Sequence, residues 1–226
     1  MKYEILASGS AGNATIINDE ILIDCGVPLK TLAPYKDKLK IVLLTHEHGD
    51  HFKPSTVAAL AKSRPTLRWA ACEWMIPKLV YIGVRESQID VIQLDQAVSY
   101  EGIAAIMPQK LVHDVPNCCW HIFTKSGSLF YATDTGTLDG IEAKGYDLYL
   151  VEANHKKAEI EERFRQKRDW GYYSYEIRAA ENHLSEEQAQ DWLTENMSQK
   201  SEWIPMHQHR EIEKEGKSNG KCARHR

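Results

Sequence analysis

The chain has 226 residues, which is enough for one domain with a substantial hydrophobic core. Hydrophobic residues make up 42% of it and charged residues 27%, and 28 basic against 32 acidic residues give a net charge of −4. That charge is too mild to indicate a nucleic-acid partner by itself. No apolar run approaches the roughly 18 residues that a membrane span needs, so we predict no membrane association.

Cysteine usage points to a reducing compartment. The five cysteines are an odd number and form no C-x-x-C pair. The N-terminal residues show no charged stretch followed by an apolar one, which is the pattern of a secretory signal. We therefore predict reduced thiols and a cytoplasmic protein.

Short β-branched and apolar runs alternate with helical patterns along the chain. Strands are predicted over residues 2–7, 14–17, 21–23, 41–45, 67–71, 129–133, 148–151 and 202–206, with further short strands between 89 and 125. Helices are predicted over residues 29–39, 55–62, 73–81, 156–168 and 186–197, the last with a Ser185/Gln188 capping box. This order predicts an α/β (α+β) fold in which two sheets pack together under helices. We expect one domain over 1–209 and a basic, disordered tail over 210–226.

Ten histidines are the unusual feature of the composition, and they cluster. His46, His48, Asp50 and His51 stand within six residues, directly after a predicted buried strand. Imidazole nitrogens together with a carboxylate oxygen suit zinc, manganese or iron. The spacing, with Gly49 inside the run, favours a loop that wraps around metal over a helix. The alternative is an exposed polar loop after a strand.

The run His46-x-His48-x-Asp50-His51 matches the H-x-H-x-D-H signature of the metallo-β-lactamase superfamily, which the chain resembles over about residues 2–206. The resemblance implies a four-layer αββα sandwich and two divalent metal ions, Zn²⁺ or Mn²⁺. It implies one ion on His46, His48 and His113, a second on Asp50, His51 and His183, and a bridging Asp134.

Each later ligand has an alternative interpretation. His113 alone would more often be a satisfied histidine at a strand end, Asp134 a turn residue, and His183 part of a helix-capping segment. Asp24, after the third predicted strand, either orients a ligand or belongs to a turn.

Three further segments resemble small WalJ-type hydrolases, whose known members are DNA exonucleases. They are the Gly/Ser-rich loop 8–13, the segment 152–155 and the segment 182–185. The departures from the family pattern are Ala11, Ala153 and Asn182. The resemblance suggests substrate contacts from Ser10, Asn13 and Asn154.

Catalysis is assigned to Asp50, His155 and Glu152. His155 follows a strand end, as the ligands do, and is predicted to protonate the leaving oxygen or bind the scissile phosphate, with Glu152 orienting it. The alternative is that His155 caps the charged helix that follows.

Basic residues of the segment 156–168, ending in Arg168, precede an aromatic stretch at Trp170, Tyr172, Tyr173 and Tyr175. Basic and aromatic side chains together suit phosphate binding and base stacking. The alternative is a solvated helix followed by a packed loop. His207 and His209 stand two apart and either line the pocket or lie at the surface.

The leading hypothesis is a dinuclear phosphodiesterase in which a hydroxide shared by two metals attacks a nucleic-acid phosphodiester in the manner of an exonuclease. One alternative is a cyclic-nucleotide phosphodiesterase, such as phages use to evade host signalling. Another is a lactone or ester hydrolase. An intact ligand set disfavours a non-catalytic binding protein, and His48 disfavours an iron oxidoreductase, because those relatives usually carry Glu there. A nucleic acid or nucleotide is thus the expected substrate, and a homodimer the expected assembly.

Overall fold

A computed structural model describes residues 1–168 and 180–208, apart from the side chains of residues 164 and 166–168. Its core is two six-stranded sheets. The first sheet has the strand order β1 (Tyr3–Ala7), β2 (Ala14–Ile17), β3 (Ile21–Ile23), β4 (Ile41–Leu44), β5 (Arg68–Ala71), β6 (Ile89–Val91). The second has the order β12 (Glu202–Met206), β11 (Leu148–Glu152), β10 (Gly127–Ala132), β9 (Asn117–Thr124), β8 (Ala104–Leu111), β7 (Val98–Tyr100).

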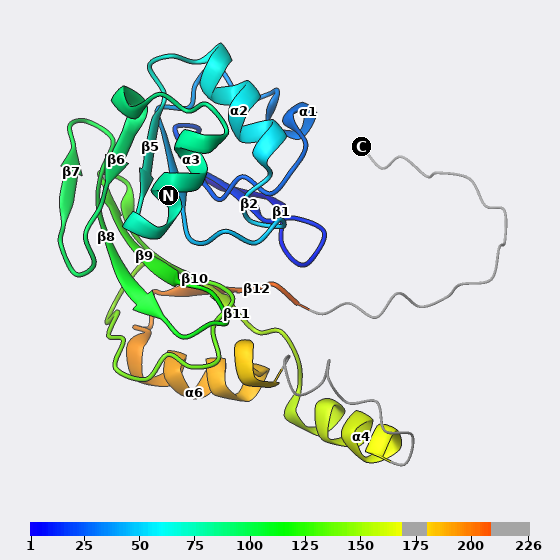
Figure 1. Ribbon diagram of the computed structural model, residues 1–226. Helices are drawn as coiled ribbons and strands as arrows, with labels where there is room; N and C mark the ends of the chain where they lie inside the picture. Colours follow the sequence, from blue (N-terminus) through cyan, green and yellow to red (C-terminus); the bar gives the residue numbers. More distant parts are fainter. Residues whose placement is uncertain (169–179, 209–226) are drawn as a thin grey trace, which may run out of the picture.

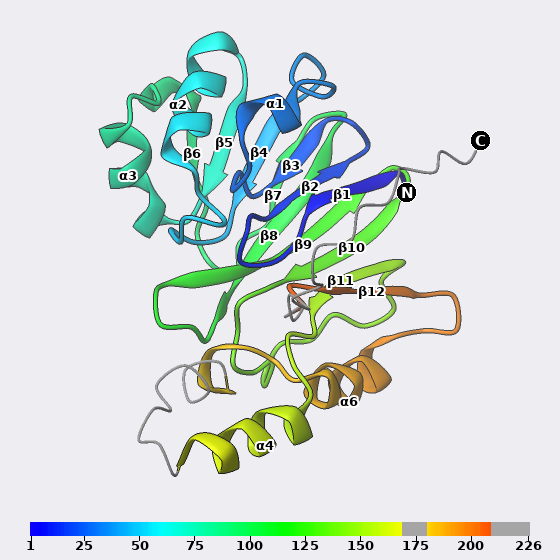
Figure 2. The same ribbon diagram turned by 90° about the vertical axis from the view of Figure 1, so that its right-hand side faces the viewer.

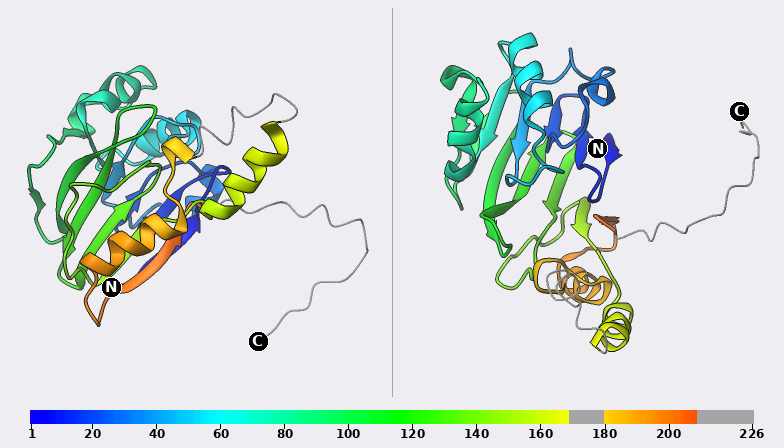
Figure 3. Two further views of the ribbon diagram at one scale, coloured as in Figure 1. Left: turned by 90° about the horizontal axis from the view of Figure 1, so that it is seen from below. Right: turned by 45° about the vertical axis from the view of Figure 1, so that its right-hand side comes forward.

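Helices cover the outer faces of both sheets. The helices are α1 (Leu29–Leu32), α2 (Pro54–Ser63), α3 (Ile76–Tyr81), α4 (Lys157–Arg168) and α6 (Glu186–Asn196), with 3-10 turns at Glu73–Met75 and Glu86–Gln88. In Figures 1 and 2, α1, α2 and α3 lie over the first sheet and α6 lies below the second. Figure 3 shows α6 running across the second sheet and α4 projecting beyond it.

Three hydrophobic clusters fill the spaces between these layers. One joins the first sheet to α2 and α3 and includes Leu44, Val57 and Leu79, and one lies between the sheets. The third joins the second sheet to α6 through residues such as Val151 and Leu193. The predicted four-layer αββα sandwich is therefore confirmed.

Most predicted elements occur at their expected positions. The capping box of α6 is present, with Ser185 Oγ accepting from Gln188 N at 3.1 Å and Gln188 Oε1 accepting from Ser185 N at 3.0 Å. The helix predicted over 29–39 ends at Leu32, because Pro34 lacks the N–H that a longer helix needs. None of the helices described is long and apolar enough to cross a membrane.

The sheet topology gathers many strand ends at one edge. β3 runs parallel to β4, and β10, β11 and β12 run parallel to one another. β8 points the same way as β10, because both are antiparallel to β9. Within each sheet, polar residues that follow the carboxyl ends of these strands therefore lie at one edge, and the 3.3 Å contact between His48 and His113 shows that the two edges adjoin.

The loop after β4 packs against the backbone of Gly26. A Cβ at Gly26 would lie 1.7 Å from the Asp50 carbonyl oxygen. We expect Gly26→Ala to displace this loop and to lower the free energy of unfolding by about 3 kcal/mol or more. Urea unfolding monitored by circular dichroism would measure the loss. Gly49→Ala is the matched control, because a Cβ there meets nothing within 4 Å. Equal stability of the two variants would contradict the packing argument.

His121 in β9 is a buried histidine whose neighbours hold it neutral. Its Nε2 lies 2.8 Å from Gln109 Oε1 and its Nδ1 lies 2.8 Å from the Tyr146 hydroxyl. The Gln109 amide donates to Asp95, so its oxygen faces the ring and Nε2 is the protonated nitrogen. Burial disfavours the charged ring and lowers the pKa of His121 to about 4.

This pKa makes the contribution of His121 to stability depend on pH. Below about pH 6.5 the unfolded chain takes up a proton that the folded protein does not. The stability of the folded protein therefore decreases as the pH is lowered. The destabilisation by His121→Phe should therefore shrink by about 2 kcal/mol between pH 7 and pH 5. Urea unfolding of both proteins at the two pH values tests this, and a pH-independent difference would contradict it.

Candidate metal centre

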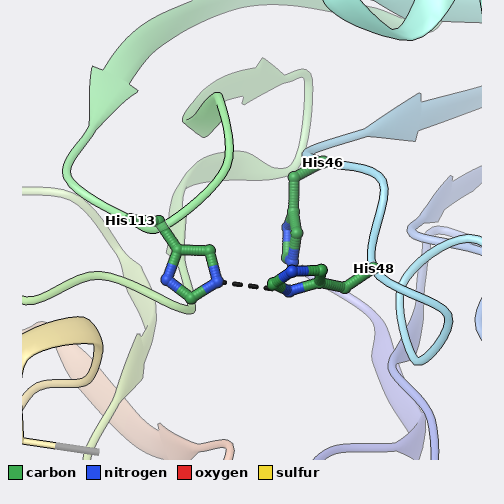
Figure 4. A group of neighbouring side chains, drawn as sticks. All are labelled: His46, His48 and His113. Carbon is green, nitrogen blue, oxygen red and sulfur yellow. Dashed lines mark hydrogen bonds between the residues drawn. The ribbon is translucent and has the colours of Figure 1, made fainter. Parts of the chain in front are cut away.

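Three histidines from two loops form the first donor set (Figure 4). His46 and His48 follow β4, and His113 follows β8. One ring nitrogen of each lies within 4.8 Å of the others. His48 Nδ1 and His113 Nε2 are 3.3 Å apart. Two nitrogens bound at about 2.05 Å to one tetrahedral zinc would also be about 3.3 Å apart, so this pair has the spacing of zinc ligands.

His46 has a buried ring nitrogen with no protein partner among the described residues. Its Nδ1 lies 3.0 Å from Thr45 Oγ1, whereas its buried Nε2 has no hydrogen-bond partner among the described residues. Burial holds the pKa of His46 well below its usual value, so the ring is neutral. Because the Thr45 hydroxyl donates to Asp24, it accepts from His46 Nδ1–H, which leaves Nε2 unprotonated. A buried, unprotonated nitrogen without a protein partner is suited to bind a metal. The donor set therefore fits a divalent ion.

Asp114 lies against His48 and His113, the two histidines whose ring nitrogens are 3.3 Å apart. Its Oδ1 is 3.4 Å from His48 Nε2 and 3.2 Å from His113 Nε2. The contact with His48 leaves Nδ1 as the nitrogen of that ring directed at the donor set. Asp114 directly follows a predicted ligand, but no sequence motif assigned it a role.

The second donor set consists of Asp50, His51 and His207, whose donor atoms also lie within 4.8 Å of one another. Asp24 fixes the ring of His51, with Oδ2 2.6 Å from Nδ1. His51 Nε2 then faces Asp134 Oδ2 at 2.7 Å. Burial opposes protonation of His51, but the carboxylates of Asp134 and Asp24 outweigh it and hold the pKa of His51 well above its usual value.

Three residues of the centre have left-handed backbone conformations. The φ angles are +58° at Asp24, +57° at Asp134 and +51° at His207. Each residue lies one or two positions after a strand, at the ends of β3, β10 and β12. Such angles are uncommon outside glycine and cluster at functional sites.

Glu152, fully buried at the end of β11, connects two histidines. Its Oε1 lies 2.7 Å from His183 Nδ1 and 3.0 Å from His207 Nδ1. Its Oε2 accepts hydrogen bonds from the backbone N–H groups of Thr135 and Leu184. The rings of His183 and His207 are stacked, with centroids 5.2 Å apart. Glu152 therefore orients both rings.

The arrangement of His183 differs from the sequence-based expectation. His207, not His183, lies with Asp50 and His51, while His183 groups with Asp134, Glu152 and His207. The physical reason is the pairing of β12 with β11, which delivers the residue after β12 to the centre. This geometry favours His207 as the histidine of the second set.

Other predicted site residues lie around these sets. His155 Nδ1 is 3.4 Å from Asn154 Oδ1, and the described hydrogen bonds of Glu152 go to other residues. Asn154 Nδ2 donates to the His207 carbonyl oxygen at 2.8 Å. Ser10 is exposed and Asn13 is fully buried beside Asp50. The side chain of Arg168, the aromatic residues of 170–175 and His209 lie outside the described residues.

Residues 19–208 match the family described as "Beta-lactamase superfamily domain", and the chain belongs to this family. It is 30% identical over 175 residues to the exodeoxyribonuclease WalJ of Streptococcus pneumoniae serotype 2, and the aligned region covers 68% of this chain and 62% of WalJ. It is 27% identical over 174 residues to the exodeoxyribonuclease YycJ of Bacillus anthracis, which covers 69% and 63%. The chain thus spans less than two thirds of the length of these curated relatives.

Solved structures show the same fold. The metallo-β-lactamase fold protein YhfI from Bacillus subtilis matches with a TM-score of 0.68 and 19% identity, over 91% of this chain and 85% of YhfI. Human tRNase Z, short form, matches with a TM-score of 0.64 and 15% identity, over 92% of each chain. The superfamily resemblance read from the H-x-H-x-D-H run is confirmed.

Proposed function

We propose that this protein is a metal-dependent phosphodiesterase that hydrolyses a phosphodiester bond of a nucleic acid in the manner of an exonuclease. The observation that carries the proposal is the convergence of two three-donor sets, with Asp134 between them, at one edge of the sandwich. The exodeoxyribonuclease names of WalJ and YycJ support a nucleic-acid substrate.

We assign His46, His48 and His113 to one divalent ion, Zn²⁺ or Mn²⁺, and Asp50, His51 and His207 to a second. Asp134 is the shared ligand, because its donor atom groups with His46 and His51 as well as with His207. Two bound ions would activate a water molecule and neutralise charge on the reacting phosphate. Contacts with Thr45 and Asp24 orient the rings of His46 and His51 for this.

His183 is the non-ligand group best placed to act on the substrate. Its Nδ1 is held by Glu152, its Nε2 has no partner among the residues that the structure describes, and its side chain is 20% exposed where that of His207 is 6% exposed. A ring fixed at one nitrogen and open at the other can donate a proton to the leaving oxygen. Glu152 is then the residue that positions it.

A turnover screen of zinc- and manganese-loaded protein tests the proposal. It would compare end-labelled single- and double-stranded DNA, RNA, a panel of cyclic mononucleotides and a simple lactone. Progressive shortening of end-labelled strands is the expected result. Turnover of cyclic nucleotides with intact DNA would replace the polymer by a small substrate, and turnover of the lactone alone would overturn the phosphodiesterase assignment. The cytoplasmic location and the homodimer stay predictions from the sequence.

A further inference from the structure

Residues 8–13, the loop between β1 and β2, contact two of the loops that carry the second donor set. The backbone N–H of Asn13 donates to the Asp50 carbonyl oxygen at 2.6 Å. At the other end, Ser8 Oγ accepts from the backbone N–H of His207 at 2.7 Å. One short loop therefore joins the segment after β4 to the segment after β12.

Asn13 reaches the ligands themselves. Its side chain is fully buried, and its Oδ1 accepts from Gly9 N at 2.9 Å. Because that bond fixes the amide oxygen, the NH₂ group faces the ligands, with Nδ2 3.3 Å from Asp50 Oδ2 and 2.7 Å from His51 Nε2. Asn13 thus contacts the side chains of two donors and is a positioning residue, where its sequence context suggested a substrate contact.

Ser8 acts on the backbone of the third donor. His207 has a φ of +51°, a conformation that a residue other than glycine keeps only when its surroundings hold it. The Ser8 hydroxyl accepts the His207 N–H, and Asn154 Nδ2 donates to the His207 carbonyl oxygen. Both peptide groups that flank the His207 side chain are therefore fixed from outside β12.

The first donor set has no such support from this loop. The described polar contacts of the His46, His48 and His113 rings go to Thr45, to Asp114, to the Asn182 carbonyl oxygen and to one another. The loop after β4 carries donors of both sets, but the side chain of Asn13 contacts only those of the second, Asp50 and His51.

We infer that residues 8–13 form a bracket that sets Asp50 and His207 at the separation required by the second metal ion, so that this ion alone depends on Ser8 and Asn13. The inference rests on the two-ion assignment proposed above. It gives the Gly/Ser-rich loop a role in metal retention that does not involve the substrate.

The test is the release of zinc from the holoprotein under increasing chelator, followed by metal analysis. Wild type is expected to lose its two ions in separate steps. Asn13→Ala and Ser8→Ala should release the second ion at a chelator concentration lower than the wild-type value by a factor of about 10 or more. This is the effect expected when a residue that orients a ligand is lost. The first ion should leave at the wild-type concentration. Ser8→Thr keeps the hydroxyl and should restore the wild-type value.

Asn196→Ala is the matched control for general destabilisation. Asn196 is a buried amide whose Oδ1 accepts from Ala143 N at 2.9 Å and whose Nδ2 donates to Trp192 O at 2.9 Å, far from either donor set in the fold. Its removal should leave both release steps unchanged. Unchanged release of the second ion in both Ser8→Ala and Asn13→Ala, or an equal loss of both ions, would overturn the inference. A wild-type protein that binds fewer than two ions would overturn the proposed function as well, so the two failures are distinguishable.

Discussion

Asp134→Ala is expected to abolish hydrolysis and to reduce bound metal from two ions per chain to one or none. The side chain is 4% exposed, and its two oxygens face different partners, with Oδ2 2.7 Å from His51 Nε2 and Oδ1 3.5 Å from His207 Nδ1. No neighbouring carboxylate occupies the same position between the donor sets, within the part of the chain that the structure describes. Metal analysis of the purified variant, together with its turnover of end-labelled DNA, gives the two readouts.

The contributions of the Asp134 side chain's charge and size to metal binding can be tested separately. Burial would raise the pKa of Asp134, but His51, His207 and His46 outweigh it and hold the pKa well below its usual value, so the group is a carboxylate. Asp134→Asn keeps the size and removes the charge, and it should fail as Asp134→Ala does, because an amide is a poor shared ligand for two cations. Two retained ions and wild-type turnover in both variants would refute the shared-ligand assignment.

The parts of this site that the sequence predicts are those in which the chemistry is local. Four donors lie within residues 46–51, so their proximity can be predicted without knowing the fold. His113 and Asp134 are predictable because each lies two positions after a strand, and strands of one direction end at one edge. The sandwich follows from the same alternation of strands and helices.

The roles of His207 and Glu152 depend on contacts between distant parts of the chain. Pairing of Glu152 with Met206 in the parallel β11–β12 ladder brings His207 beside the Glu152 side chain, across 55 positions of sequence. The sequence instead suggested His155 as the partner of Glu152, on proximity along the chain alone. One signal pointed to His207, since it comes directly after a predicted strand, as the other donors do.

Comparing alanine variants of His207 and His183 gives the sharpest test of the second donor set. His207→Ala is expected to retain a single ion, because its Nε2 is buried without a hydrogen-bond partner among the described residues and groups with Asp50 and His51. His183→Ala is expected to keep both ions and to lower turnover roughly 10²- to 10⁴-fold, the range for loss of a positioned proton donor. Metal content and kcat measured on the same preparations separate the two outcomes.

Two further variants make this comparison specific. Glu152→Gln removes the charge that holds both rings and should weaken metal retention and turnover together, because Oε1 contacts His183 at 2.7 Å and His207 at 3.0 Å. His155→Ala removes an imidazole near the same edge whose one described ring contact is to Asn154, so it should retain two ions. If His183→Ala lost an ion while His207→Ala kept two, the second metal would belong to His183, as the family resemblance of the segment 182–185 implies. The structure argues against that result, because His207 groups with Asp50 and His51 whereas His183 does not, and the His183 side chain is the more exposed of the two, at 20% against 6%.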